Sequence, residues 1–99
     1  MYIKLDKIKE DEHHVYYKFY TNVQGESYLS KSGNLRYKLE TKYGYCKFNK
    51  KTEKFELDKE KTDPYFTEKC REVIKVQVNL IRRKRDGLCF PDIIDIATG

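Results

Sequence analysis

The chain has 99 residues, of which 37% are charged and 38% hydrophobic, and its formal net charge is +5. At this length about two thirds of the unfolded chain's surface can be buried, which suffices for one modest core and excludes a second independent domain. Sixteen acidic residues are interspersed among twenty-one basic ones, and this mixing favours a solvated surface over a nucleic-acid footprint. We therefore expect a single domain that spans residues 1–99.

The cysteine content and the start of the chain indicate where the protein acts. Cys46, Cys70 and Cys89 are odd in number and widely spaced, so they predict reduced structural thiols rather than a disulfide framework or a metal half-site. The first ten residues lack the apolar core of a signal peptide, and no apolar run approaches the ~20 residues that span a bilayer. We expect a soluble cytoplasmic protein that does not contact a membrane, without a cofactor or a metal.

The first third of the chain predicts a β-hairpin followed by a loop. Residues 2–9 alternate loosely and end in an acidic turn at 10–12. Residues 13–21 alternate better, with Val15, Tyr17 and Phe19 on one face and polar residues and tyrosines on the other. Residues 22–34 are polar, hold two glycines and show no period, so they are expected to form a loop.

Two further strands are predicted in the middle of the chain. Residues 35–40 alternate as a half-buried antiparallel strand whose apolar side chains face the core. Residues 42–48 are expected to pair with residues 54–58 across a turn at 49–53. In that register Cys46 and Phe48 share one face, and the other face carries Tyr43, Tyr45 and Lys47.

Residues 63–86 carry the pattern of an amphipathic helix. Asp63 can cap free amide groups, Pro64 fits the first helical position, and Gly87 supplies a stop. Residues 74–80 also alternate with the period of a strand, and the two end signals favour the helix over this rival. The apolar arc of this helix is wider than contact with one sheet face requires. Part of the arc is therefore available for a second contact, such as the interface of a homodimer. The tail 88–96 cannot continue the helix through Pro91 and is expected to be extended.

Together these elements predict an α+β fold. A four- to five-stranded antiparallel sheet, arranged as a meander, has one C-terminal helix packed on one face and an extended C-terminal tail. The helix is expected to bury its apolar stripe against the sheet, and replacement of Ile74 by Asp is expected to unfold the domain because an unpaired buried carboxylate costs several kcal/mol. The expected core comprises Phe66, Cys70, Val73, Ile74, Leu80 and Ile81 of the helix, and Val15, Phe19, Leu35, Leu39, Phe55 and Leu57 of the sheet.

The stretch from Lys42 to Phe48, KYGYCKF, raises the question of what its aromatic rings contact. Residues 43–48 resemble the central strand of the RNA-recognition motif, in which aromatic rings stack on bases, and Met1 to Leu5 resemble its companion strand. Lys42 stands where that signature has its first glycine, and the alternating residues 13–21 do not supply the helix that the fold needs after its first strand. Single-stranded nucleic acid is therefore the alternative partner, and an ordinary half-exposed sheet surface is favoured.

No set of side chains in the sequence assembles into a catalytic site. His13 and His14 are adjacent and so point to opposite faces of a strand, which prevents them from forming one acid–base site. The protein is therefore predicted not to be an enzyme. Two groups are candidates for contact with a partner, and the basic group also suits the negative end of a helix dipole. They are Tyr43, Tyr45 and Lys47 in the middle of the chain, and Arg82, Arg83, Lys84 and Arg85 near its end.

The order of elements, taken with LDKIKEDEHHVYYKF, YCKFNKKTEKFELD and LCFPDIIDIATG, resembles a group of small bacterial proteins of this length. They are immunity proteins of contact-dependent growth-inhibition and related polymorphic toxin systems. The resemblance implies a non-catalytic, cytoplasmic module that binds and neutralises a cognate toxin domain. Immunity proteins against nuclease toxins are often acidic, so the charge of +5 departs from that pattern, and the resemblance carries no contact residue over to this chain.

Overall fold

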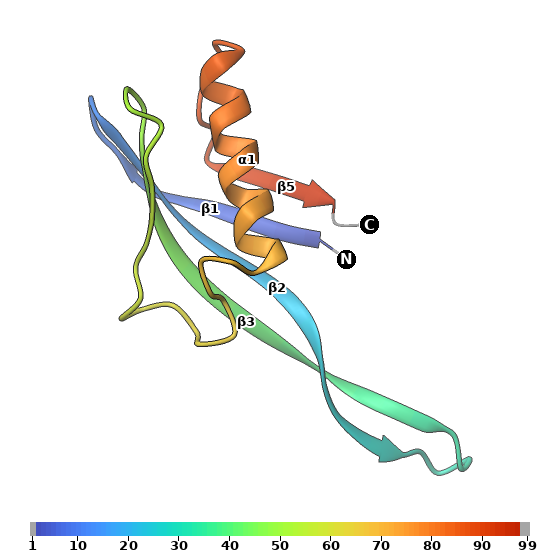
Figure 1. Ribbon diagram of the computed structural model, residues 1–99. Coiled ribbons are helices and arrows are strands. Elements are labelled where there is room, and N and C mark those ends of the chain that lie inside the picture. The colour runs from blue at the N-terminus through green and yellow to red at the C-terminus, as the bar shows by residue number, and fades with distance from the viewer. Residues whose placement is uncertain (1, 98–99) are drawn as a thin grey trace.

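The computed structural model describes residues 2–97, which form one five-stranded antiparallel sheet and one helix (Figure 1). The helix α1 spans Arg71–Arg85, and the strands run in the order β4-β3-β2-β1-β5. This confirms the predicted α+β meander with one helix, and the C-terminal tail becomes the fifth strand by pairing with β1. Met1 of the stretch compared with the RNA-recognition motif, and residues 98–99, lie outside the described residues. The strands are β1 (Tyr2–Glu10), β2 (His14–Leu29), β3 (Leu35–Asn49), β4 (Phe55–Leu57) and β5 (Ile93–Ala97).

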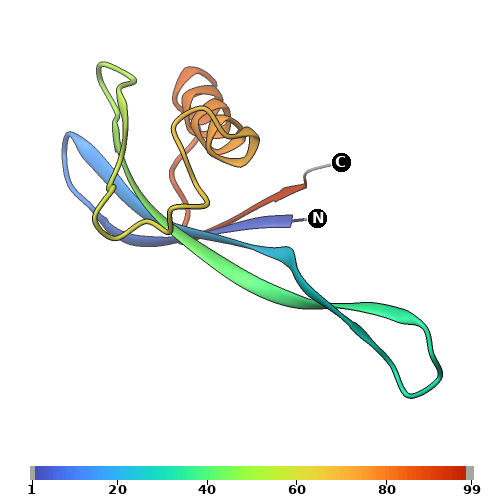
Figure 2. The same ribbon diagram turned by 60° about the horizontal axis from the view of Figure 1, so that its bottom comes forward.

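The molecule has two layers, because α1 packs on one face of the sheet, which we call the inner face (Figure 2). The opposite, outer face carries no helix among residues 2–97. We call α1 together with the sheet, apart from residues 24–40, the body. Its core is a single cluster of apolar side chains. This cluster contains Ile3, Leu5, Val15, Tyr17, Phe19, Cys46, Phe48, Phe66, Val73, Val76, Leu80, Phe90 and Ile94.

The predicted first hairpin is confirmed. The strands β1 and β2 pair antiparallel, and Val15, Tyr17 and Phe19 are fully buried on the inner face. The turn closes on Asp11, whose carboxylate Oδ1 accepts hydrogen bonds from the backbone N–H groups of His13 and His14 at 2.9 and 2.7 Å. A short polar side chain that bonds its own backbone is a local turn device, which explains why the acidic tripeptide ends the strand.

The prediction of a loop over residues 22–34 is wrong, because β2 continues to Leu29 and only residues 30–34 turn. The two long strands leave the body as a two-stranded ribbon, residues 24–40, which we call the arm (Figure 1). It makes the molecule 55 Å long but only 27 by 22 Å across. At the tip Gly33 takes a φ of +83°, a left-handed conformation that suits glycine. The arm is solvent-exposed on both faces, so its sequence carries no alternation between apolar and polar residues along β2.

The side chains of Leu35, Tyr37 and Leu39 do not reach the core as predicted. The strand β3 runs without a break from Leu35 to Asn49, so all its odd-numbered residues share the outer face with Tyr45. The inner face receives the even-numbered Gly44, Cys46 and Phe48. Leu35 and Leu39 are accordingly 58% and 73% exposed.

The helix is shorter than predicted, because it starts at Arg71 rather than at Pro64. Asp63 does cap a turn, with its Oδ1 accepting the backbone N–H of Tyr65 at 2.8 Å, but the turn does not propagate. Instead Phe66 is buried and its ring lies 5.0 Å from that of Phe19 in an edge-on arrangement. The predicted stop at Gly87 is confirmed by its φ of +69° and by its N–H, which donates to the carbonyl of Lys84.

The predicted burial of Ile74 is wrong, since its side chain is 46% exposed, whereas Val73, Val76 and Leu80 form the buried stripe of α1. The expected unfolding by Asp at position 74 therefore loses its physical basis. Phe55, Leu57, Cys70 and Ile81 pack partly buried around the core. Within residues 2–97, α1 is too short and too polar to cross a membrane.

Candidate interaction surface

The outer face of the sheet carries tyrosines and lysines in cross-strand rows. In the β2–β3 register Tyr20 lies opposite Tyr43, and one row further along Lys18 lies opposite Tyr45. Lys4 of β1 extends the first row because it lies opposite Tyr20. Opposed side chains on one sheet face are in contact distance, so these rows form one surface. We call this surface the tyrosine face, and it comprises Tyr2, Lys4, Tyr16, Lys18, Tyr20, Tyr43, Tyr45 and Lys47.

Direct contacts hold the centre of the tyrosine face together. The rings of Tyr20 and Tyr43 lie 5.8 Å apart and tilted by 40°. The ammonium of Lys18 lies 4.5 Å from the ring centre of Tyr43 and 5.9 Å from that of Tyr45. A cation over an aromatic ring is attracted by the negative ring face, so Lys18 fixes both rings in place.

Both signs of charge are present around these rings. Lys47 pairs with Glu56 of β4 at 3.2 Å, and Lys54 reaches the same carboxylate at 3.1 Å. The hydrogen bonds from Lys54 and Lys47 lower the pKa of Glu56, so the carboxylate stays ionised. On the other side of the face Asp95 of β5 lies opposite Lys4. The tyrosine face is therefore mixed in charge rather than uniformly basic.

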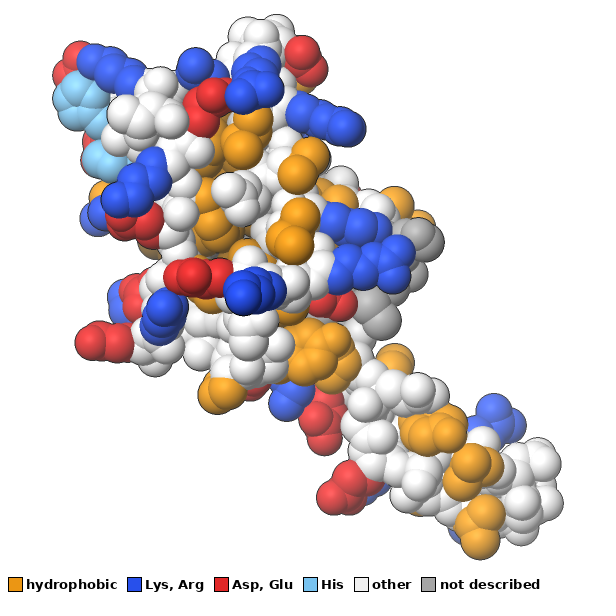
Figure 3. Space-filling view, viewed as in Figure 1, with side chains coloured by type: hydrophobic (Ala, Val, Ile, Leu, Met, Phe, Trp, Pro, Cys, Tyr) orange, Lys and Arg blue, Asp and Glu red, His pale blue; other side chains and the backbone are white. Residues whose placement is uncertain are grey.

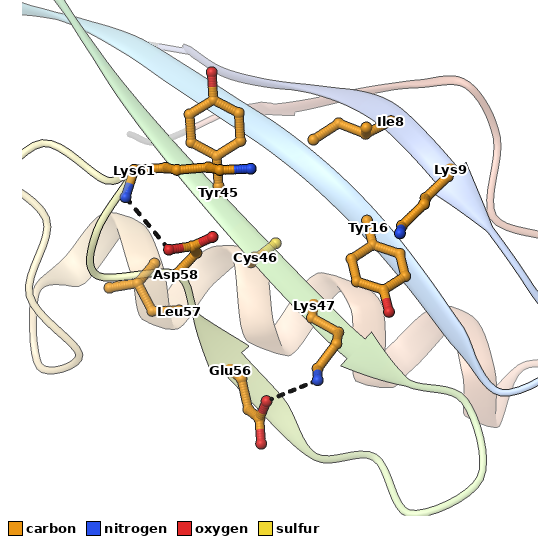
Figure 4. A pocket seen from close by; sticks show the side chains of 10 residues that line it. All are labelled: Ile8, Lys9, Tyr16, Tyr45, Cys46, Lys47, Glu56, Leu57, Asp58 and Lys61. Atoms are coloured by element: carbon orange, nitrogen blue, oxygen red, sulfur yellow. Dashed lines mark hydrogen bonds and ion pairs between the residues drawn. The ribbon is translucent and has the colours of Figure 1, made fainter.

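Two shallow hollows border the rings. One has a volume of about 480 Å³ and lies between Tyr16, Tyr45 and Glu56, with the helix on the far side of the sheet (Figure 4). The other is lined by Tyr2, Tyr20 and Tyr43 on one side and reaches Leu39 at the base of the arm. Each hollow is open to solvent and polar at its rim. Such hollows can receive single side chains of a partner rather than enclose a small molecule.

The structure separates the two predicted groups of contact residues. Tyr43, Tyr45 and Lys47 lie together on the tyrosine face, whereas Arg82–Arg85 end the helix on the inner side of the sheet. The basic group has internal partners: Arg85 forms two hydrogen bonds with Glu53, at 2.9 and 3.2 Å. The four cations occupy the last turn of α1, as the helix-dipole interpretation predicts.

The glycine in KYGYCKF has a structural role. Gly44 lies opposite Phe19, and a Cβ atom at this position would overlap the Phe19 ring. The absence of a side chain thus leaves room for the Phe19 ring, which packs against Phe66. No helix separates β1 from β2, so the chain does not have the element order of the RNA-recognition motif.

The thiol and imidazole groups do not assemble into a reactive site. Cys46 lies on the inner face away from Lys47, and burial raises the pKa of its thiol to about 12. His14 opens β2 with its Nδ1 3.9 Å from the Asp11 carboxylate. Within residues 2–97 no group of three or more His, Cys, Asp and Glu side chains is arranged to hold a metal ion.

Sequence reasoning named Tyr43 and Tyr45 as contact candidates and missed their neighbours Tyr20 and Lys18. The alternation in residues 13–21 had already placed Tyr16, Lys18 and Tyr20 on the face opposite Phe19. The missing information was the register that brings this face beside Tyr43. Comparison with known proteins adds nothing to this surface, since no protein family, curated protein or solved structure matches the chain.

Proposed function

We propose that the protein is a non-catalytic binding protein that acts in the cytoplasm and presents its tyrosine face to a protein partner, a cognate toxin domain that it neutralises. The observation that carries this proposal is the gathering of five tyrosines on one open sheet face. Tyrosine offers a large, rigid contact area and a hydroxyl group, and it is enriched in the centres of protein interfaces. The partner's class rests on the resemblance of the sequence pattern to immunity proteins.

The mixed charge of the face supports a protein partner in particular. Lys47 is paired with Glu56, and Lys4 lies opposite Asp95, so a uniformly negative ligand would meet carboxylates as well as ammonium groups. A protein surface can match such a pattern with charges of both signs, which gives specificity more than raw affinity. Contact with this face would cover a surface or a cleft that the toxin needs.

Isothermal titration calorimetry with the toxin-like product of the adjacent upstream gene tests the proposal. Replacement of Tyr43 by Ala should weaken binding roughly tenfold or more, because truncation of a central aromatic contact typically costs over 1 kcal/mol. Tyr65, which is 42% exposed compared with 43% for Tyr43 but lies outside the tyrosine face, is the matched control. Equal binding by wild type and the Tyr43 variant would exclude this face as the contact. A neighbouring toxin that is neither bound nor inhibited would exclude the partner class.

Single-stranded nucleic acid is the second candidate partner, favoured by one specific observation. Tyr20 and Tyr43 present adjacent rings, with Lys18 beside them as a cation for a phosphate. Stacking of a base on such a ring is worth about 1–3 kcal/mol and tolerates any sequence. The basic run at 82–85 does not join this face, so the phosphate contacts fall to the lysines of the sheet.

Fluorescence anisotropy of a labelled single-stranded oligonucleotide tests this candidate. Binding should weaken steeply as salt rises, and the Tyr43→Ala variant should bind less tightly at every salt concentration while the Tyr65→Ala control binds as wild type does. Affinity that is independent of salt, or equal affinity for a duplex of the same sequence, would reject the candidate.

A further inference from the structure

The arm exposes apolar side chains on the face that continues the tyrosine face. Figure 3 shows hydrophobic side chains gathered along the arm, well away from the core. A two-stranded ribbon is marginally stable in water, and exposed leucines on it mark a surface that another molecule covers. The residues of this apolar strip are Leu29, Leu35, Tyr37 and Leu39, and each is at least 45% exposed.

The two edges of the arm differ in how open they are. The edge formed by β2 is interrupted by a bulge between Gln24 and Ser27, where Gly25 and Glu26 oppose a single residue of β3. A bulge interrupts the regular spacing of backbone hydrogen-bonding groups and so blocks further pairing at an edge. The edge formed by β3 has no such interruption along the arm. It is therefore the edge on which another strand can add.

The body determines where this open edge ends. The backbone N–H of Asp63 donates to the carbonyl of Tyr43 at 2.9 Å, so the connector before α1 covers the edge at that residue. Because backbone groups of an antiparallel strand point alternately to its two sides, the carbonyl and N–H groups of Tyr37, Leu39 and Thr41 point to the same edge as those of Tyr43. These three residues form the free stretch next to the body.

We propose that a second copy of this chain adds to this edge, so that two arms pair antiparallel across a two-fold axis at Leu39. In this register Leu39 lies opposite its own counterpart, and Tyr37 lies opposite Thr41 of the other copy. Lys38 then opposes Glu40 of the other copy, and the symmetry makes this ion pair twice. Glu40 also lies 3.4 Å from Lys42 in its own chain, so each carboxylate lies between two ammonium groups.

The neighbouring registers are disfavoured by charge. A two-fold axis at Lys38 would set this ammonium against its own copy, and an axis at Glu40 would do the same with two carboxylates. Opposed like charges destabilise a strand pair, whereas opposite charges stabilise it. The axis at Leu39 also opposes Arg36 to Lys42 of the other copy, but the charge of Lys42 is already offset within its own chain by Glu40 at 3.4 Å and Asp63 at 3.9 Å. An axis at Lys38 would pair Arg36 with Glu40 of the other copy, but it would leave the two Lys38 ammonium groups opposed at the axis itself. We therefore place the axis at Leu39, and the arrangement joins the two outer faces into one sheet surface.

The other sheet edges fit a second copy less well. The strand β4 has three residues, which is too short for a stable ladder. The edge of β5 is free, but a two-fold axis at its central residue, Asp95, would oppose two carboxylates. Ile93 on that edge is 63% exposed and serves as the comparison site for the test.

Sedimentation equilibrium with two charge-reversed variants tests the register. Lys38→Glu alone and Glu40→Lys alone should each weaken self-association roughly tenfold, since both create like-charge pairs across the axis. An equimolar mixture of the two variants should associate as tightly as wild type, because each cross-axis pair then joins a carboxylate of one chain to an ammonium group of the other. Variants that lose association and stay monomeric when mixed would overturn the register, and a wild-type chain that is monomeric at every concentration would overturn the dimer.

Disulfide trapping locates the axis independently. In a Cys89→Ser background, which removes the exposed thiol, Leu39→Cys should form a covalent dimer on mild oxidation. Directly opposed residues of paired strands have Cα atoms ~5.5 Å apart, within the range that a disulfide spans. Ile93→Cys on the β5 edge and Val78→Cys on the exposed side of α1 should remain monomeric under the same conditions. Trapping at position 93 or 78 in place of 39 would overturn the proposal by identifying another interface.

Discussion

The body and the arm are built from the same two strands, yet one half of each strand is buried and the other is not. In the body, β2 places Tyr17 and Phe19 beneath α1 with no exposed surface. In the arm, β3 places Leu39 in solvent with 73% of its surface exposed. Alternation along a strand determines which residues share a face, but only a second layer decides whether that face is buried. The apolar residues of β3 in the arm are therefore surface residues, whereas the apolar residues on the inner face of the body form the core.

The largest expected difference is between the same substitution made in the two regions. Leu5→Ala should lower the free energy of unfolding by about 2–5 kcal/mol, because Leu5 is fully buried between strands and helix. Leu39→Ala should change it by less than about 0.5 kcal/mol, because the side chain already meets water. Urea denaturation of dilute monomer measures both. A cost above about 2 kcal/mol for the Leu39 variant would show that the arm belongs to the cooperative unit.

This contrast also explains which parts of the fold could be predicted from sequence. The first hairpin and the inward orientation of Cys46 and Phe48 followed from alternation, because the body buries one face of those strands. Residues 22–29 gave no such pattern, because both faces of the arm are wet. Leu35 and Leu39 were assigned to the core because residues 35–40 alternate, but alternation alone does not say which face is buried. Both residues are odd-numbered like Tyr45 on the same unbroken strand, which places them on the outer face.

The helix start and the interaction surface show a second limit of sequence reasoning. Asp63 and Pro64 have the chemistry of a helix start, but the tertiary contact of Phe66 with Phe19 requires a different backbone path. Prediction of the tyrosine face would have required the register between β2 and β3, which a single sequence does not specify. Short-range chemistry was therefore predictable, and long-range pairing was not.

The next largest effect is expected at the glycines, of which each region has one inside a strand. Gly44→Ala should cost about 1–3 kcal/mol, because the new methyl group meets the Phe19 ring inside a packed core. Gly25→Ala in the arm meets only the Glu40 side chain, at 2.8 Å, and this flexible group can move away. Thermal melting of both variants checks the difference. Equal costs at the two positions would mean that Phe19 can relax, and the structural role of Gly44 would be wrong.

A smaller effect is expected from removing one hydroxyl group. The Tyr17 hydroxyl is buried and donates to the carbonyl of Pro91 at 2.6 Å, which ties β2 to the segment before β5. Tyr17→Phe should cost about 1 kcal/mol, because the carbonyl loses its partner. Tyr37→Phe in the arm should be silent within about 0.5 kcal/mol. Denaturant midpoints measured under identical conditions compare the two, and a silent Tyr17 variant would show that water replaces the bond.

The smallest effect is a dependence on pH that belongs to the body alone. The hydrogen bonds from Lys50 and Lys7, at 2.9 and 3.0 Å, lower the pKa of Glu10 below its ordinary 4.5. A carboxyl group whose pKa is lower in the folded state stabilises the fold above its unfolded pKa and loses this contribution as pH falls through the folded value.

Glu10→Gln should therefore cost less than about 1 kcal/mol at neutral pH, as for other exposed ion pairs, and the cost should vanish below the lowered pKa. Glu26→Gln on the arm, away from Lys7 and Lys50, is the matched control for the loss of one carboxyl group. Urea midpoints between neutral pH and the acid limb measure the three profiles. Lys50 follows β3 and Lys7 belongs to β1, so the Glu10 carboxylate links these two strands. If the stability difference between wild type and Glu10→Gln disappears at low pH, the ion pairs of Glu10 stabilise this end of the body. If the difference is the same at every pH, the contribution of Glu10 does not depend on its charge.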